Sequence, residues 1–230
     1  MHKLLPNHKL FLNILRLALV IIIVGLLFLP VGRVLAVGAA GSALSFDGVD
    51  DMVRLTFTNS VMGGTAWKDT KTVSLWTKPE GSATECTRQD VALCDNIFGD
   101  KPRWWGISRG VTSGLDRIYV WNYSAGYAII AIPYTIGEWV HITLVHEGGT
   151  LRAYKNGVLV GSVASGTTEQ PSTGAIPELY IGGGIKVNPN TTENWSFHGQ
   201  IDEVRLYTIG LSQTAIRAAI EATSDSWSVA

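Results

Sequence analysis

The chain contains few charged residues and no long run of one sign. Charged residues are 16% of its 230 residues, below the roughly 25% of an average soluble protein. Hydrophobic residues reach 46%, and 25 residues are Gly. This composition argues against disorder, collagen and coiled coil. The basic residues Lys3, Lys9, Arg16 and Arg33 lie in residues 1–36, which hold no acid, so the remainder is acidic. An acidic domain without a basic patch predicts no nucleic-acid partner.

Cysteine is also scarce, with Cys86 and Cys94 as the two in the chain. If the chain is exported, a pair this close in sequence predicts a disulfide. A zinc site is the alternative, but the C-x7-C spacing does not match the usual C-x2-4-C, and no second pair of ligands follows.

The N-terminal segment has the order of a secretory signal. A cationic start precedes an apolar run of 13 residues from Leu17 to Leu29, and Val34-Leu35-Ala36 supplies small residues for cleavage before Val37. That run is short for a membrane span, which needs about 20 residues. An uncleaved anchor remains the alternative, because Leu10–Ile14 is apolar too. Either reading exports the rest of the chain, with a membrane contact only if the segment is retained.

From residue 43 onward, short alternating strands are separated by Gly, Asn, Asp and Pro. Asn156-Gly157 between two apolar runs is a strong hairpin signal. Ten or more strands without intervening helices predict an all-β sandwich or barrel. One helix is expected near the C-terminus, with Ser212 as its N-cap and its end near Ala222. Leu211 and Ile216 are placed to form a hydrophobic staple, the contact that fixes how the chain enters the helix.

Three segments in order carry a family resemblance. They are Ala43–Val53, then Gly137–Ile142 leading into Leu151–Val160, and finally Gly199–Tyr207. Together they resemble the laminin-G-like jelly rolls of the concanavalin A-like lectin/glucanase superfamily, particularly the pentraxin-related branch. The resemblance implies a two-sheet antiparallel jelly-roll β-sandwich, with one sheet concave.

The expected organisation therefore has four parts. Residues 1–36 form a signal peptide or an uncleaved anchor, predicted to be helical, and residues 37–42 form a linker. Residues 43–222 form the laminin-G-like domain, with its short C-terminal helix. Residues 223–230 are a tail with no readable pattern.

The acidic residues do not form the pattern expected of a glycosidase on this fold. Such enzymes need two carboxylates at a defined separation, usually on alternate residues of one strand so that they share a face. No Asp/Glu-x-Asp/Glu occurs, and no G-x-S-x-G either. We therefore expect no enzyme, with a divergent glycoside hydrolase left open because two acids could meet from different strands.

Asp202 suggests a metal. In a regular strand it shares a face with Val204 and Leu206, and a carboxylate facing a core needs a cation or several donors. One interpretation is structural Ca²⁺ held by Asp202 with Asp47 and Asp51. The alternatives are that Asp202 accepts N–H groups of a turn or pairs with Arg54, and that Asp47 is a plain Asx-turn residue.

Aromatic residues supply the candidate ligand surface. The chain has eight Trp, of which Trp76 and Trp139 are predicted to be core. The candidates for exposed sugar-stacking platforms are Trp104, Trp105, Trp121, Tyr123 and Trp195. The alternative for each is that it anchors a loop against the sandwich.

Fold alone does not define function in this superfamily. The leading hypothesis is a secreted or cell-surface, non-catalytic module that binds a glycan or another extracellular ligand. The second is a structural or assembly protein that binds another protein through a sheet face.

Overall fold

The computed structural model describes residues 34–37, 42–56, 68–86, 94–101, 104–168, 178–184 and 195–224. Residues 1–33 of the predicted leader, most of the linker and the end of the tail lie outside these residues. Val37, assigned to the linker from the sequence, ends strand β1 (Val34–Val37), so β1 spans the predicted cleavage point after Ala36. No helix within the described ranges is long and apolar enough to cross a membrane.

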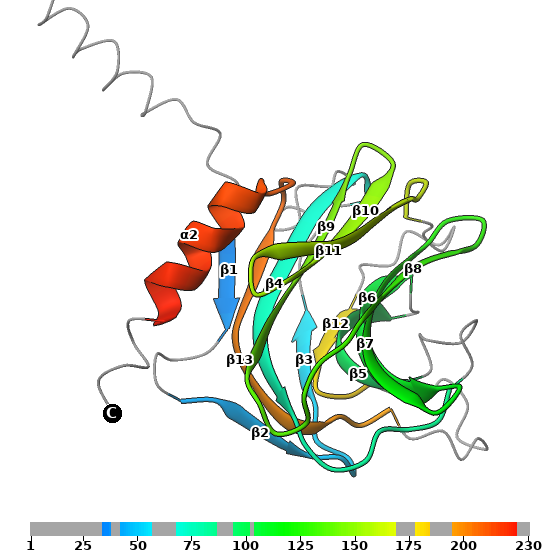
Figure 1. Cartoon of the computed structure of the whole chain (residues 1–230), viewed down its shortest axis with the longest axis vertical. Coiled ribbons are helices and arrows are strands. Elements are labelled where there is room, and N and C mark those ends of the chain that lie inside the picture. The colour runs from blue at the N-terminus through cyan, green and yellow to red at the C-terminus, as the bar shows by residue number, and fades with distance from the viewer. Residues whose placement is uncertain are drawn as a thin grey trace, which may run out of the picture. The chain divides into compact units, whose positions relative to one another are not determined.

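The strands form two antiparallel sheets packed face to face (Figure 1). The seven-stranded sheet has the order β1-β13-β4-β9-β10-β11, and β2 pairs with β13 beside this path. Its further strands are β2 (Leu44–Asp47), β4 (Thr70–Pro79), β9 (Val140–Glu147), β10 (Thr150–Lys155), β11 (Val158–Ala164) and β13 (His198–Tyr207).

The six-stranded sheet has the order β3-β12-β5-β6-β7-β8. Its strands are β3 (Val53–Thr56), β5 (Asp95–Lys101), β6 (Trp105–Thr112), β7 (Leu115–Tyr123), β8 (Tyr127–Ile132) and β12 (Glu178–Ile181). The predicted all-β jelly-roll sandwich is confirmed.

The main core lies between the sheets and follows from alternation along each strand. Val73 and Leu75 on β4 belong to the same hydrophobic cluster as Ile118 and Val120 on β7, and all four are fully buried. Because successive side chains of a strand point to opposite faces, the intervening residues lie on the outer faces. On β4 this places Trp76 on the outer face, half-buried, so its assignment to the core was wrong. Trp139, just before β9, is also half-buried rather than part of the core.

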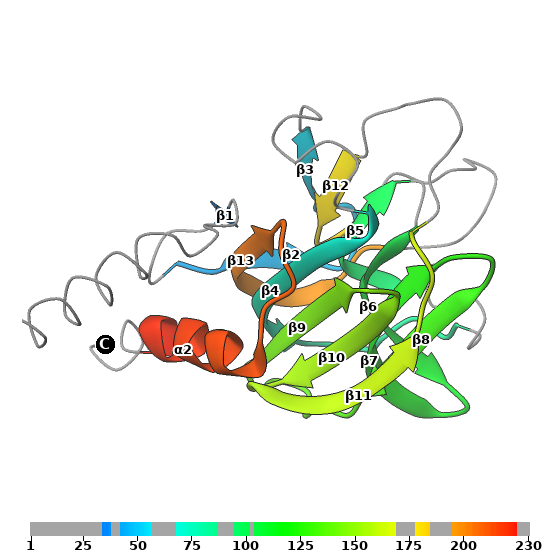
Figure 2. The same ribbon diagram turned by 90° about the horizontal axis from the view of Figure 1, so that it is seen from above.

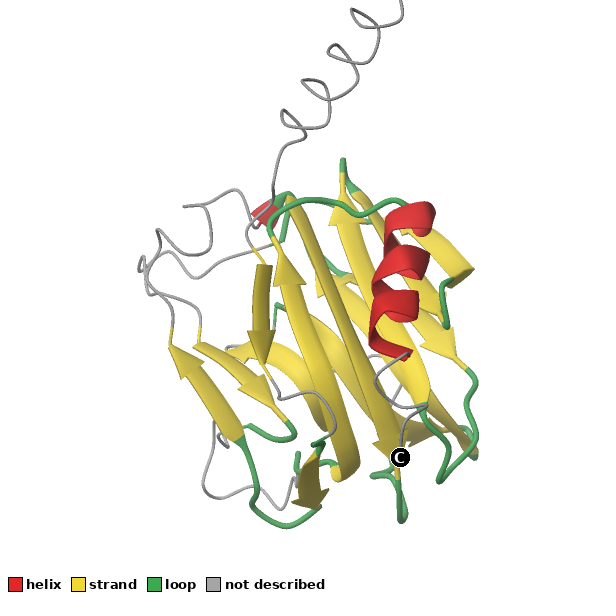
Figure 3. Cartoon of the chain, turned by 90° about the vertical axis from the view of Figure 1, so that its left-hand side faces the viewer, coloured by secondary structure: helices red, strands yellow, loops and turns green. Residues whose placement is uncertain are grey.

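Helix α2 (Gln213–Ser224) covers the outer face of the seven-stranded sheet, as Figure 3 shows. The Ser212 hydroxyl accepts the backbone N–H of Ala215 at 3.2 Å, which is the predicted cap. Ile216 is buried against Val145 and Tyr154, with Leu211 beside it. Figure 2 shows this helix on the β4–β9 side, away from β7 and β8.

The predicted Asn156-Gly157 turn joins β10 to β11. Both residues have positive φ, 49° and 71°, which is the conformation that a two-residue type I′ hairpin requires.

Candidate functional site

An aromatic row lies at the β7–β8 end of the six-stranded sheet. Tyr127 on β8 is paired with Tyr123 on β7, and their ring centroids are 4.8 Å apart. The Tyr127 ring also contacts Trp121 at 5.8 Å, and Tyr123 contacts Trp104 at 5.3 Å. We call Trp104, Tyr123 and Tyr127 the aromatic row.

Exposure separates the members of this group. Tyr127 is 39% exposed, while Tyr123 and Trp104 are half-buried. A half-exposed ring combines apolar area with a polar edge, as at many ligand surfaces. Within the described residues, Tyr127 is thus the most exposed ring of the row, whereas Trp104 also packs against the main core and its Nε1 is buried.

Three of the five aromatic candidates named from the sequence are buried. Trp105, Trp121 and Trp195 are 0%, 2% and 4% exposed, so the expectation that their rings form exposed platforms does not hold. Trp105 points into the core, where its ring lies 5.7 Å from that of Phe98. Trp121 is on the outer face but packs over Gly106, whose added Cβ would lie 3.1 Å from its ring. The alternative, anchoring of a loop against the sandwich, fits Trp195, which lies in the loop before β13, whereas Trp105 and Trp121 are buried residues of strands β6 and β7.

Tyr127 was not among the aromatic residues that the sequence analysis named as ligand-surface candidates, although the turn before it could have indicated its position. Ser124-Ala125-Gly126 breaks the apolar pattern between the two strands, and Ala125 and Gly126 have positive φ. A tight turn at this point brings Tyr127 opposite Tyr123.

Beside the row, the predicted disulfide between Cys86 and Cys94 is confirmed, with a Cα–Cα distance of 5.8 Å. Its sulfurs lie over Gly110 of β6. Cys94 joins Tyr119 and Trp121 in a small apolar cluster on this outer face. The segment before Cys86 pairs with β6, since Val111 N–H donates to Thr84 O and Cys86 N–H donates to Val111 O, both at 2.9 Å. The disulfide thus covers part of the sheet and holds its covering segment on β6.

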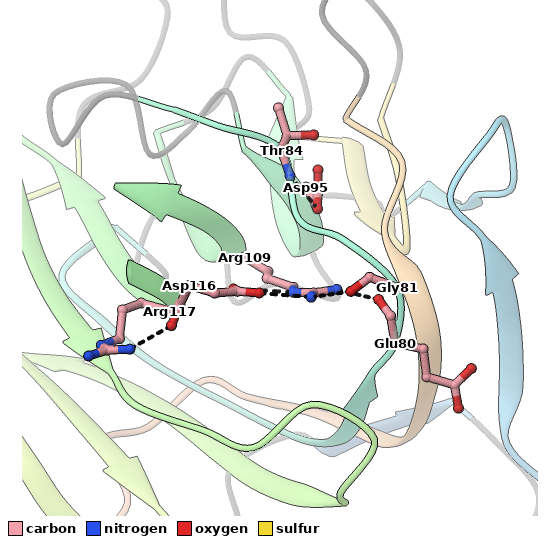
Figure 4. A network of polar contacts seen from close by, with 7 residues as sticks. All are labelled: Glu80, Gly81, Thr84, Asp95, Arg109, Asp116 and Arg117. Carbon is pink, nitrogen blue, oxygen red and sulfur yellow. Dashed lines mark hydrogen bonds and ion pairs between the residues drawn. The ribbon is translucent and has the colours of Figure 1, made fainter. Parts of the chain in front are cut away.

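The buried Arg109 holds the start of the segment that runs from Glu80 to Cys86 (Figure 4). Arg109 is 0% exposed and forms an ion pair with Asp116 at 2.9 Å. Its two terminal nitrogens also donate to the backbone oxygens of Glu80 and Gly81, at 2.5 and 2.8 Å. The interactions with Asp116 and Tyr134 raise the pKa of Arg109, against the effect of burial. The residue stays charged and ties three segments together.

A pocket of about 410 Å³ lies where the segment meets the β6–β7 turn. It is lined by Glu85, Cys86, Val111, Ser113 and Gly114. The pocket is next to the disulfide, so its shape depends on the disulfide-linked segment.

The Asp47–Asp51 turn gathers three exposed carboxylates. One oxygen from each of Asp47, Asp50 and Asp51 lies within 4.8 Å of the others. The backbone N–H of Val49 donates to Asp47 Oδ1 at 2.7 Å, which confirms an Asx turn. Oxygen ligands of this kind suit a hard cation such as Ca²⁺.

Asp202 does not belong to this cluster. The expectation that it shares a face with Val204 and Leu206 is wrong, because the register of β13 shifts between Asp202 and Arg205. Glu203 has a φ of 51° at this bulge, and Asp202 lies opposite Trp76 on the outer face. There its Oδ1 accepts the N–H of Glu203 at 2.7 Å.

The alternative partner proposed for Asp202, Arg54, pairs with Glu178 instead. Burial is the largest cause that raises the pKa of Asp202.

The chain matches a family described as the concanavalin A-like lectin/glucanases superfamily, Laminin_G_3, over residues 46–217, and it belongs to that family. A search of curated proteins finds no match to the chain.

Solved structures share the fold. A SAP-like pentraxin from Limulus polyphemus is 19% identical over 75% of this chain and 78% of that chain, with a TM-score of 0.52. A structure of botulinum neurotoxin type C, whose cell entry is dependent upon interaction with two ganglioside molecules, is 14% identical over 84% of this chain and 46% of that one, with a TM-score of 0.53.

A Trypanosoma rangeli sialidase is 15% identical over 84% of this chain and 30% of its own, with a TM-score of 0.55. The chain therefore spans less than half of the neurotoxin and of the sialidase. At these identities the likeness defines the fold.

Proposed function

We propose that this domain is an exported, non-catalytic binding module that binds glycans through the aromatic row. The observation that carries the proposal is the contact between the partly exposed rings of Trp104, Tyr123 and Tyr127. Rings held in this way lose little conformational freedom when an apolar sugar face packs on them. The family and the ganglioside-dependent neurotoxin with the same fold support the ligand class.

The proposal predicts that Tyr127 contributes strongly to glycan affinity. Tyr127→Ala removes the most exposed ring of the row, and we expect at least tenfold weaker binding, about 1.4 kcal/mol. Tyr127→Phe keeps the ring and should retain most of the affinity. A glycan array identifies a ligand, and titration calorimetry compares the variants with wild type.

Ile136→Ala is the matched control, because Ile136 is also an exposed apolar residue, 55% exposed, but lies in the loop before β9. It should bind as wild type does. Failure of the wild-type domain to bind any glycan, with or without Ca²⁺, would overturn the proposal.

One observation favours the second candidate function, binding of another protein. Strand β11 is at the edge of its sheet, and Val158, Leu159 and Val160 on it are 55%, 45% and 39% exposed. An exposed apolar edge is a surface on which another strand can pair. A partner-dependent shift in size-exclusion chromatography that disappears in Leu159→Lys would support this function over glycan binding.

A further inference from the structure

Lys71 is buried between the two sheets, an unusual place for an amine. It lies on β4 and is 0% exposed. Its Nζ crosses to the opposite sheet, where it lies 5.0 Å from the centroid of the Trp105 ring. The same Nζ donates to the hydroxyl of Thr168 at 2.6 Å.

The Thr168 hydroxyl also contacts a buried amide. It donates to Oδ1 of Asn122 at 2.6 Å, and Asn122, on β7, is 0% exposed. The Nδ2 of Asn122 donates to Ser165 Oγ at 2.8 Å. An amine from one sheet and a carboxamide from the other therefore share one hydroxyl, in a region without exposed atoms of either side chain.

A buried carboxyl lies near the amine. Asp100 on β5 is 4% exposed, and its Oδ1 accepts the backbone N–H groups of Trp104 and Trp105 at 2.8 and 3.0 Å. Its Oδ2 has no hydrogen-bond partner among the described residues. Burial raises the pKa of Asp100 to about 7 and lowers the pKa of Lys71 to about 7, while their mutual attraction opposes both shifts. Both shifts favour a neutral amine beside a protonated carboxyl.

We propose that Lys71 and Asn122 react to form an isopeptide bond that links the two sheets covalently. The lone pair of Nζ attacks Cγ of Asn122, the Cγ–Nδ2 bond breaks, and the amide nitrogen leaves as ammonia with the proton that Nζ loses. The step needs no oxidant or other reactant. It requires the Lys71 side chain to rotate so that Nζ moves from the Thr168 hydroxyl onto Cγ.

The surrounding groups have defined roles in this step. The Thr168 hydroxyl donates to the oxygen on which negative charge develops, as in an oxyanion hole. Asp100 accepts the proton of the Lys71 ammonium before the attack, which makes the amine nucleophilic. Water is excluded by the core, so hydrolysis of the new bond is disfavoured.

Peptide mapping by mass spectrometry of the full, oxidised chain tests the bond directly. We expect a peptide pair joined through Lys71 and Asn122 that is lighter by one ammonia than the two peptides apart. Lys71→Arg should abolish it. Recovery of both peptides unlinked in the folded wild type would overturn the proposal, and a link lighter by one water would overturn the choice of Asn122 because it would indicate Asp100 as the acceptor.

The role of Asp100 has its own test. Asp100→Asn should slow formation of the bond at least tenfold, followed as the linked fraction over time after refolding of chains that mass spectrometry shows to be unlinked at the start. Asp95→Asn is the matched control, since Asp95 is also a buried carboxyl on β5 with a raised pKa but contacts Thr84 rather than the Lys71 region. Equal rates in both variants would contradict a proton-accepting role for Asp100.

Discussion

The buried carboxyl of Asp95 makes the stability of the fold depend on pH. Asp95 is 2% exposed, and burial raises the pKa of its carboxyl to about 6 although Thr84 N–H donates to it. In the unfolded chain the same group has a pKa of about 4. Between these values the folded state retains a proton that the unfolded state has lost. The contribution of Asp95 to stability therefore falls as the pH rises from about 4 to about 6.

Asp95→Asn should remove this pH dependence. Asn keeps an oxygen that can accept the Thr84 N–H but does not ionise. Relative to wild type, the variant should gain stability between pH 4 and pH 7, by up to about 3 kcal/mol. Chemical denaturation at both pH values measures the difference. Other buried groups titrate in both proteins, so a difference that stays constant with pH would contradict the prediction.

Asp202 shows where reasoning from single residues reaches its limit. The alternation of Asp202, Val204 and Leu206 correctly predicts a strand, but a bulge at Glu203 reverses the face of Asp202. A bulge inserts one extra residue into a strand, and a Gly at that position is one sign of it in a sequence. Here the position is occupied by Glu203, so the sequence does not reveal the bulge. The position of a carboxylate on one face or the other therefore required the structure.

Elements with strong local signals were predictable. The Asn156-Gly157 hairpin, the Ser212 cap and the close pair Cys86 and Cys94 each depend on a few neighbouring residues, and all three are confirmed. The burial of Trp121 depends instead on a glycine of β6 and on Cys94, which are distant in sequence. Such contacts appear only when the strands are assembled.

Gly110 on β6 lies under the disulfide, where there is no room for a larger side chain. A Cβ at Gly110 would overlap Cys86 Sγ and lie 2.7 Å from Cys94 Sγ. Gly110→Ala should therefore displace the disulfide segment and destabilise the domain by about 1–3 kcal/mol. Thermal melting and thiol titration of the folded protein measure the two effects.

Gly184→Ala is the control for this substitution. The nearest atom to its added Cβ is 3.8 Å away, in the Trp195 ring, which is ordinary contact. It should melt close to wild type. Similar melting of the two variants would show that the disulfide segment is not packed on Gly110 as described.

For the whole molecule, Ca²⁺ binding at the Asp47–Asp51 turn remains a proposal with a clear test. An ion that binds the folded state alone adds about 2.7 kcal/mol at 100 times its dissociation constant. We expect Tm to rise with Ca²⁺, and Asp51→Asn to remove most of that rise. Melting curves in Ca²⁺ and in EDTA measure it.

Asp202→Asn is the control, because Asp202 is outside the carboxylate cluster. Its effect on Tm should be the same in Ca²⁺ and in EDTA. A wild-type Tm that does not change between the two conditions, in protein shown by metal analysis to be loaded at the start, would end the calcium proposal.

The position of α2 has a consequence for valency. The helix occupies the outer face of the seven-stranded sheet through Ile216, whereas the aromatic row lies on the other sheet. Under the proposed function, one copy presents a single aromatic row on one side of the sandwich. Avidity on a surface with many glycans must come from several copies held together, by an anchor or by assembly, with the gain set by their effective concentration.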